Sequence, residues 1–238
     1  MNKQNYSQIP TWCSGCGIYA VSFALKQALK ELGIKSKNVV VSYDIGCSGN
    51  MVNILDVCGI ETLHGRSIPV ACGIKAARND LTVLAQAGDG GLLNEGLNHF
   101  IHAIERNDPI TLFVNNNNVF GLTAGQQSSA TPKGVLPRAA QKANSFEPLS
   151  IVDLAVVTQA NFIARVHENN IEQIKEVLKK AIRFDGFAVV EIIQPCKIWA
   201  KDFPNKKYRS VDRPFSDRLK IIGQENLLGI LYSNEGGG

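Results

Sequence analysis

Long apolar segments are absent from this sequence. None approaches the roughly 20 consecutive apolar residues that a membrane-spanning helix requires. Residues 1–10 are polar and lack the apolar centre of a secretory signal peptide. We therefore expect a cytoplasmic protein that has no membrane partner.

A strong excess of charge of one sign is also absent. The formal net charge is +4, which is too small to indicate nucleic-acid binding by itself. The aromatic residues are not interleaved with the basic ones, as they are in proteins that bind single strands. No nucleic-acid partner is therefore expected. The 45% hydrophobic and 19% charged content is typical of a packed globular protein.

Internal repeats are absent as well, and apolar segments alternate with amphipathic ones along most of the chain. This alternation predicts an α/β protein with a doubly wound parallel sheet. We expect one domain over residues 1–196 and a basic C-terminal tail over residues 197–238. The predicted strands are 38–45, 81–87, 110–114, 161–166 and 187–193, and the predicted helices are 18–32, 69–78, 92–106, 149–159 and 171–184.

The most informative stretch is residues 81–126, where a strand, a glycine turn, a helix and a second strand follow one another. Asp89 and Asn117 each come just after one of these strands. Because parallel strands end at one edge of the sheet, the two side chains should meet there. A carboxylate, an amide oxygen and a nearby carbonyl suit Mg²⁺, and the glycines around Asp89 let backbone N–H groups approach phosphates. This combination resembles the metal and diphosphate motif of thiamine-diphosphate enzymes; a plain loop turn is the alternative.

Six cysteines in a cytosolic chain are more typical of reduced thiols or metal ligands than of disulfides. Cys13 and Cys16 form a Cys-x-x-Cys turn, and Cys47 and Cys196 each follow a predicted strand. Four thiolates at one edge would select Zn²⁺ or an iron–sulfur cluster. A position beside a cofactor that carries electrons favours the cluster. The two other thiols, at positions 58 and 72, are expected to be buried and structural.

Several motifs in the chain are similar to those of one family, the thiamine-diphosphate-binding beta subunit of 2-oxoacid:ferredoxin oxidoreductases. In order, they are Trp12-Cys13-Ser14-Gly15-Cys16-Gly17, Ile45-Gly46-Cys47-Ser48-Gly49, Leu63-His64-Gly65-Arg66, Gly88-Asp89-Gly90, Asn98-His99-Phe100-Ile101-His102-Ala103, Val119-Phe120-Gly121-Leu122-Thr123 and Pro195-Cys196. They cover most of the chain in the order that the family has.

The resemblance implies the thiamine-diphosphate-binding fold and a set of site residues. Cys13, Cys16, Cys47 and Cys196 would hold a [4Fe–4S] cluster, with Trp12 covering the site from water. Mg²⁺ would be ligated by Asp89, Asn117 and the carbonyl of Val119. The residues implied to line thiamine diphosphate are Ile45, Gly46, Cys47, Ser48, His64, Gly65, Gly88, Gly90, Gly91, Leu122 and Thr123.

The implied reaction is oxidative decarboxylation of a 2-oxoacid, with coenzyme A taking the acyl group and ferredoxin the electrons. His64 would position substrate or move protons, and Arg66 would meet a substrate carboxylate; structural and surface roles are the alternatives. Many relatives that look specific for 2-oxoglutarate have lysine where this chain has Asn50. The turn before it still favours 2-oxoglutarate, with pyruvate or broad specificity as alternatives. A non-redox thiamine-diphosphate lyase or transferase and a zinc-ribbon module are the rival functions.

Two further expectations concern partners. No acidic residue in the chain has a motif for activating the cofactor's aminopyrimidine ring. In the family, the glutamate that activates this ring comes from a separate alpha subunit, so the resemblance implies such a partner. Residues 197–220 contain eight basic and only three acidic residues, so this segment accounts for the whole positive excess. Because ferredoxins are usually acidic, we expect Lys206, Lys207 and Arg209 to steer ferredoxin to the cluster. A solvated tail, or one that wraps the alpha subunit, is the alternative.

Overall fold

The computed structural model describes residues 10–204 and 206–234. The expectation about a signal peptide rests on residues outside this part. The described chain contains one eight-stranded sheet with the order β2-β1-β3-β4-β8-β7-β10-β9. Its first six strands are parallel to one another, so the expected doubly wound α/β class is confirmed. Among the described helices, none is both long and apolar enough to cross a bilayer.

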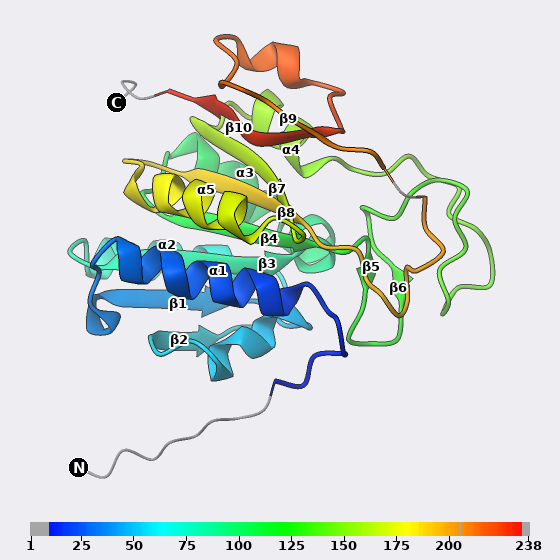
Figure 1. Ribbon diagram of the computed structural model, residues 1–238, viewed down its shortest axis with the longest axis horizontal. Helices are drawn as coiled ribbons and strands as arrows, with labels where there is room; N and C mark the ends of the chain where they lie inside the picture. Colours follow the sequence, from blue (N-terminus) through cyan, green and yellow to red (C-terminus); the bar gives the residue numbers. More distant parts are fainter. Residues whose placement is uncertain (1–9, 205, 235–238) are drawn as a thin grey trace.

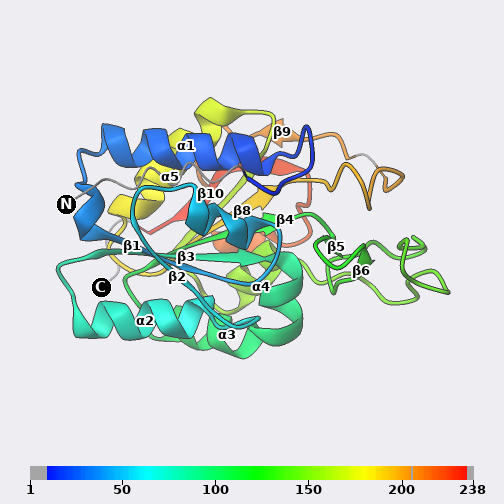
Figure 2. The ribbon, with the colours of Figure 1, turned by 90° about the horizontal axis from the view of Figure 1, so that it is seen from below.

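Helices cover both faces of this sheet (Figures 1 and 2). On one face, α1 (Ile18–Glu31) and α5 (Ile171–Arg183) lie side by side and bury a core that includes Leu25 and Leu178. On the other face, α2 (Ser67–Ala77), α3 (Leu97–Glu105) and α4 (Ile151–Val157) cover a second core. The central strands are therefore buried on both faces, which explains why they read as continuous apolar runs in the sequence.

The parallel strands are β1 (Val39–Tyr43), β2 (Cys58–Glu61), β3 (Thr82–Gly88), β4 (Thr111–Asn116), β7 (Phe162–His167) and β8 (Ala188–Ile193). Five of them were predicted, with no end shifted by more than two residues. The exception is β2, a short strand with all four residues exposed at the edge of the sheet. It lacks the apolar alternation that would have revealed it.

The predicted helix over residues 92–106 is interrupted in the structure. A π-helical turn, η3 (Gly91–Glu95), comes first, and α3 begins only after Gly96. A Cβ at Gly96 would lie 3.0 Å from the carbonyl oxygen of Gly65. This close backbone approach interrupts the regular helix beside the turn that contains His64.

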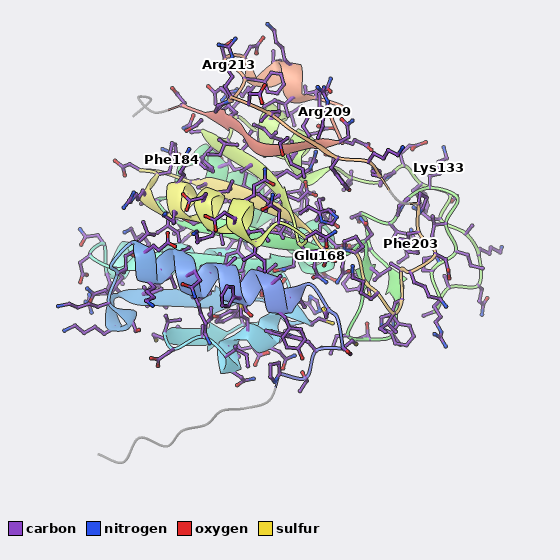
Figure 3. All side chains as sticks on the ribbon, in the orientation of Figure 1. Lys133, Glu168, Phe184, Phe203, Arg209 and Arg213 are labelled. Atoms are coloured by element: carbon purple, nitrogen blue, oxygen red, sulfur yellow. The ribbon has the colours of Figure 1, made fainter. Side chains whose placement is uncertain are left out.

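Part of the expected C-terminal tail belongs to the sheet. The strand β10 (Leu227–Ser233) pairs antiparallel with β7, and β9 (Arg209–Ser210) pairs with β10. Figure 3 shows Arg209 and Arg213 on the segment that runs along β10, and Glu168 just beyond the end of β7. The weak periodicity after residue 196 hid this strand, because β10 lies near the sheet edge and contains a register shift.

The remaining described elements are short. They are η1 (Ser36–Asn38), η2 (Ser48–Asn53), η4 (Arg218–Ile221) and the two-stranded ribbon of β5 (Val119–Phe120) and β6 (Gln126–Gln127). The ribbon and the long loop after it project beyond the carboxyl ends of the parallel strands (Figures 1 and 2). They therefore lie at the edge where the predicted site residues should meet.

Candidate active site

The structure brings Asp89 and Asn117 into direct contact. The backbone N–H of Asn117 donates to Asp89 Oδ1 over 3.1 Å, although the residues are 28 positions apart. The contact forms because β3 and β4 are parallel neighbours that end at Gly88 and Asn116. The predicted juxtaposition of these two residues is therefore present; their role as metal ligands stays a prediction.

The Asp89 carboxyl group is buried, and burial raises its pKa to about 6. Two hydrogen bonds partly oppose this shift, the one from Asn117 and a 2.5 Å bond that the Ser128 hydroxyl donates to Oδ2. A buried carboxylate that is costly to ionise alone is a natural partner for a cation, which would offset the cost. Asp89 thus fits a metal ligand, and Ser128 is a neighbour that sequence reasoning missed.

The turn after Asn117 is held by its own asparagines. Asn117 Oδ1 accepts a 3.0 Å hydrogen bond from the N–H of Val119. Asn118 has φ +64°, and its N–H and side-chain amide both donate to Asn116 Oδ1. Asparagine tolerates this left-handed conformation better than most residues, which explains part of the asparagine run. The turn keeps Asn117 next to Asp89 and ties Val119 to Asn117.

The glycines expected around the cofactor are sites of close packing. A Cβ at Gly90 would lie 2.5 Å from the Phe120 ring, and one at Gly91 would lie 1.8 Å from Asp44 Oδ2. Gly65 has φ +68°, and a Cβ there would lie 2.5 Å from the backbone of Glu95. Larger side chains are therefore excluded at these three positions, where the backbone packs closely against Phe120, Asp44 and Glu95.

Four cysteines lie at the same edge. Burial, followed by the charges of Cys16, Cys196 and Cys13, raises the pKa of Cys47 to about 11. The pKa of Cys16 is also raised, by burial and then by Glu168, Cys196 and Cys13. Since neighbouring thiolates oppose the ionisation of Cys47 and Cys16, a cationic centre beside these two thiols would favour their ionised forms. The donor set therefore fits a metal cluster.

Hydrogen bonds hold this region together. The Trp12 indole N–H donates to the Cys47 carbonyl, and the Gln194 side chain donates to Cys16 Sγ over 3.5 Å. The backbone N–H of Trp199 donates to Cys196 Sγ over 3.3 Å. Within residues 10–204 and 206–234, however, no three His, Cys, Asp or Glu side chains converge closely enough to hold a metal ion. The thiols are neighbours without forming a closed ligand shell.

The two other cysteines differ from the prediction that both are buried. Cys58 is exposed, because it begins the exposed edge strand β2, and that prediction was wrong. Cys72 is half-buried in α2 against the core, where burial raises its pKa to about 12. Cys58 lies at the amino end of β2, whereas the candidate site lies at the carboxyl ends of the parallel strands. Cys58 is therefore a suitable control when the four site cysteines are substituted.

The remaining predicted residues lie around the same turns. His64 Nδ1 is 3.9 Å from both Asp44 Oδ1 and Glu95 Oε2. Arg66 is exposed and donates to the carbonyls of Glu95 and Gly65. Ile45 and Gly46 follow β1 in the turn toward η2, and Ser48 begins η2. Gly88 ends β3, and Leu122 and Thr123 are exposed beyond β5.

Sequence reasoning missed two buried polar groups here. Asp44 is fully buried immediately after β1. Gln86, inside β3, donates a 2.6 Å hydrogen bond to the Ser48 hydroxyl, while its own side-chain oxygen is buried without a partner among the described residues. A polar residue inside an otherwise apolar strand, or directly after one, was the available signal.

This combination of a parallel sheet with glycine and asparagine turns at its carboxyl edge defines a thiamine-diphosphate-binding domain. Residues 44–192 match the family model for the C-terminal TPP-binding domain of thiamine pyrophosphate enzymes. The chain is 39% identical, over 94% of its length and 82% of the relative, to the 2-oxoacid:ferredoxin oxidoreductase subunit beta of Saccharolobus solfataricus. It is also 37% identical to the 2-oxoglutarate oxidoreductase subunit KorB of Mycobacterium tuberculosis, over 79% of this chain and 50% of the relative.

The chain therefore belongs to the family of 2-oxoacid:ferredoxin oxidoreductase beta subunits, and it is a subunit of an oxidoreductase. Its structure is similar to that of the 2-oxoglutarate:ferredoxin oxidoreductase from Magnetococcus marinus, which was solved with 2-oxoglutarate, coenzyme A and succinyl-CoA bound. The TM-score is 0.91 at 28% identity, over 97% of this chain and 84% of that one.

Proposed function

We propose that this chain binds thiamine diphosphate, Mg²⁺ and a [4Fe–4S] cluster in a cytoplasmic, coenzyme A-dependent 2-oxoacid:ferredoxin oxidoreductase. The overall reaction turns a 2-oxoacid and coenzyme A into acyl-CoA, CO₂ and a proton, and two electrons pass singly to ferredoxin. Bound thiamine diphosphate supplies the electron sink that lets the carboxylate leave as CO₂.

One glycine carries the argument for coupling the cofactor to a cluster. A Cβ at Gly121 would lie 3.4 Å from Cys47 Sγ, 4.0 Å from Cys196 Sγ and 3.5 Å from Asn117 Nδ2. The turn expected to hold the metal therefore shares a neighbour with two of the expected cluster thiols. Short distances of this kind favour rapid electron transfer, and a purely structural zinc gains nothing from them.

The residues of this chain have distinct proposed roles. Asp89, Asn117 and the Val119 carbonyl hold Mg²⁺, and Gly88, Gly90 and Gly91 keep the turn open for the diphosphate. His64 would position substrate or move protons. Arg66, whose guanidinium already bridges two backbone carbonyls, faces outward to meet a substrate carboxylate.

The favoured substrate is 2-oxoglutarate, with pyruvate or broad specificity as the alternatives. The relatives named for 2-oxoglutarate and the bound ligand of the similar structure support this preference. Asn50, in η2 directly after the Cys47 turn, lacks the charge of the lysine found in many relatives. A competition assay of 2-oxoglutarate against pyruvate, with Asn50→Lys as the comparison, tests this assignment. The variant should shift the kcat/KM ratio toward 2-oxoglutarate.

An alpha subunit is the proposed partner, because it would supply the carboxylate that activates the cofactor. The chain should be purified without oxygen, alone and together with its alpha subunit. We expect a brown protein with about four iron and four sulfide per chain. Acyl-CoA formation should require both subunits. A colourless, zinc-containing chain would favour the non-redox alternative, and turnover by the single chain would contradict the partner.

A further inference from the structure

The carboxyl group of Asp44 is buried directly behind the proposed cofactor turn. Its Oδ1 atom accepts hydrogen bonds from the backbone N–H groups of Ile45, over 2.8 Å, and Gly65, over 2.9 Å. These bonds tie the turn after β1 to the turn that contains His64. They account for one oxygen only.

The second oxygen, Asp44 Oδ2, is buried and has no hydrogen-bond partner in the described part of the chain. It points toward Gly91, where even a Cβ would come within 1.8 Å. An unpartnered buried carboxylate oxygen is unfavourable for folding, and an asparagine would keep both backbone hydrogen bonds without a charge. The fold therefore does not explain why this residue is acidic.

His64 is the titratable group that faces this carboxylate. Its Nδ1 atom lies 3.9 Å from Asp44 Oδ1, is buried, and likewise has no hydrogen-bond partner among the described residues. The ring packs edge-on against Phe120, with 5.8 Å between centroids, and 37% of the side chain is exposed. Because Nδ1 is buried, the exposed part of the ring lies on its other side. Glu95 Oε2, also 3.9 Å from Nδ1, belongs to a half-exposed side chain.

We propose that Asp44 is a positioning residue that keeps a proton on His64 Nδ1, so that Nε2 is the atom that takes and returns a proton at the cofactor. A buried negative charge attracts the N–H dipole even at this distance, since the local dielectric is low. In water, a neutral histidine prefers the opposite tautomer, with the proton on Nε2. The arrangement has the same two groups as the carboxylate–imidazole pair by which enzymes fix a tautomer, here 3.9 Å apart and without a direct hydrogen bond. This inference rests on the proposed function for its catalytic meaning, but the tautomer can be measured without it.

The test is nitrogen NMR of the full chain labelled with ¹⁵N-histidine. The chain has only four histidines, so His64→Gln identifies the signals of His64. At a pH where the ring is neutral, we expect Nδ1 protonated and Nε2 unprotonated. In Asp44→Asn, which retains an acceptor for Ile45 and Gly65, the proton should move to Nε2. A parent chain with the proton on Nε2, or an Asp44→Asn spectrum identical to the parent, would overturn the proposal.

Glu95→Gln is the matched control, because it removes the other carboxylate at the same distance. Its more exposed charge is screened, so the tautomer should stay as in the parent. A switch in Glu95→Gln without one in Asp44→Asn would assign the role to Glu95 and overturn the proposal.

The catalytic consequence is tested with the alpha subunit present. Asp44→Asn should lower kcat for acyl-CoA formation by about 100-fold while the KM for the 2-oxoacid changes little. A switched tautomer with kcat within about twofold of the parent would mean that His64 moves no proton, and the proposal would fail. If instead the parent complex lacks oxidoreductase activity, the proposed function fails, whereas the tautomer result is unaffected.

Discussion

The indole N–H of Trp12 donates a 2.7 Å hydrogen bond to the backbone carbonyl of Cys47, 35 positions along the chain. This bond joins the Cys-x-x-Cys turn to the turn after β1. Trp12 is itself buried and packs edge-on against Tyr19, with 5.0 Å between ring centroids. The Trp12 side chain thus holds the Cys-x-x-Cys turn in place relative to the turn that contains Cys47.

Trp12→Phe should therefore weaken the site more than the fold. The lost hydrogen bond is expected to cost about 1 kcal/mol in the free energy of unfolding, measured by denaturant titration. The visible absorbance of the anaerobically purified protein should bleach faster in air, because the cover over the thiols loosens. Tyr19→Phe, which keeps the ring and removes only a 3.3 Å bond to the Trp12 carbonyl, is the control. Equal bleaching rates for parent and Trp12→Phe would refute this role.

The cysteine assignments predict a pattern across single substitutions. Cys13→Ser, Cys16→Ser, Cys47→Ser and Cys196→Ser should each abolish or destabilise the brown chromophore, because serine oxygen is a poor cluster ligand. Cys58→Ser and Cys72→Ser should leave iron and sulfide contents unchanged. Bleaching by Cys58→Ser while Cys196→Ser stays brown would show that the ligand set is wrong.

Binding of Mg²⁺ and thiamine diphosphate should depend on pH through Asp89. The metal needs the ionised carboxylate, whose pKa is about 6 in the free chain. Calorimetry should therefore show apparent cofactor affinity falling by about tenfold between pH 7 and pH 5. Asp89→Asn should lose metal and cofactor together at every pH, and unchanged affinity would contradict the assignment.

The metal-free chain should respond to pH with the opposite sign. Because the folded-state pKa of Asp89 lies above its unfolded value, this group's contribution to stability falls as pH rises from about 4 to 6. Ser128→Ala removes a hydrogen bond that lowers this pKa, so it should move the fall to higher pH. Denaturant midpoints measured across this pH range would show the shift, and superimposable curves would exclude it.

The basic segment predicts where ferredoxin approaches. Lys206 is paired with Glu225, whereas Lys207 and Arg209 are exposed, so Lys207→Glu with Arg209→Glu is the sharper charge reversal. Ferredoxin reduction should slow at low salt and lose most of its ionic-strength dependence, while reduction of a small neutral dye is unchanged. Lys35→Glu with Lys37→Glu, before β1 at the opposite edge of the sheet, is a charge-matched control. Normal ferredoxin kinetics in the first variant would assign the segment another role.

The sequence predicted correctly those helices and strands whose burial produces a regular pattern of apolar residues. The βαβ unit around Asp89, five strands and the main helices follow from segments that are buried on one or both faces. The strands β2 and β10 were missed, and Cys58 was wrongly predicted to be buried, because neither an exposed edge strand nor a register shift produces a regular period. Asp44 was missed for a different reason: its place directly after an apolar strand was a signal in the sequence, but only the folded structure shows that its second oxygen is buried without a partner among the described residues.

The pairing of β4 with β8 has a consequence for the order of assembly. Asn116, at the end of β4, donates to Glu191 in β8, although they are 75 positions apart. Until that long segment closes, Cys196 is separated from Cys47, which follows β1 on the far side of β3 and β4. Contacts of such sequence separation are slow to form, because closing the long intervening segment costs conformational entropy. The proposed cluster would therefore require a folded chain before it could bind to all four thiols, and rapid alkylation during refolding should label Cys196 until β8 has docked.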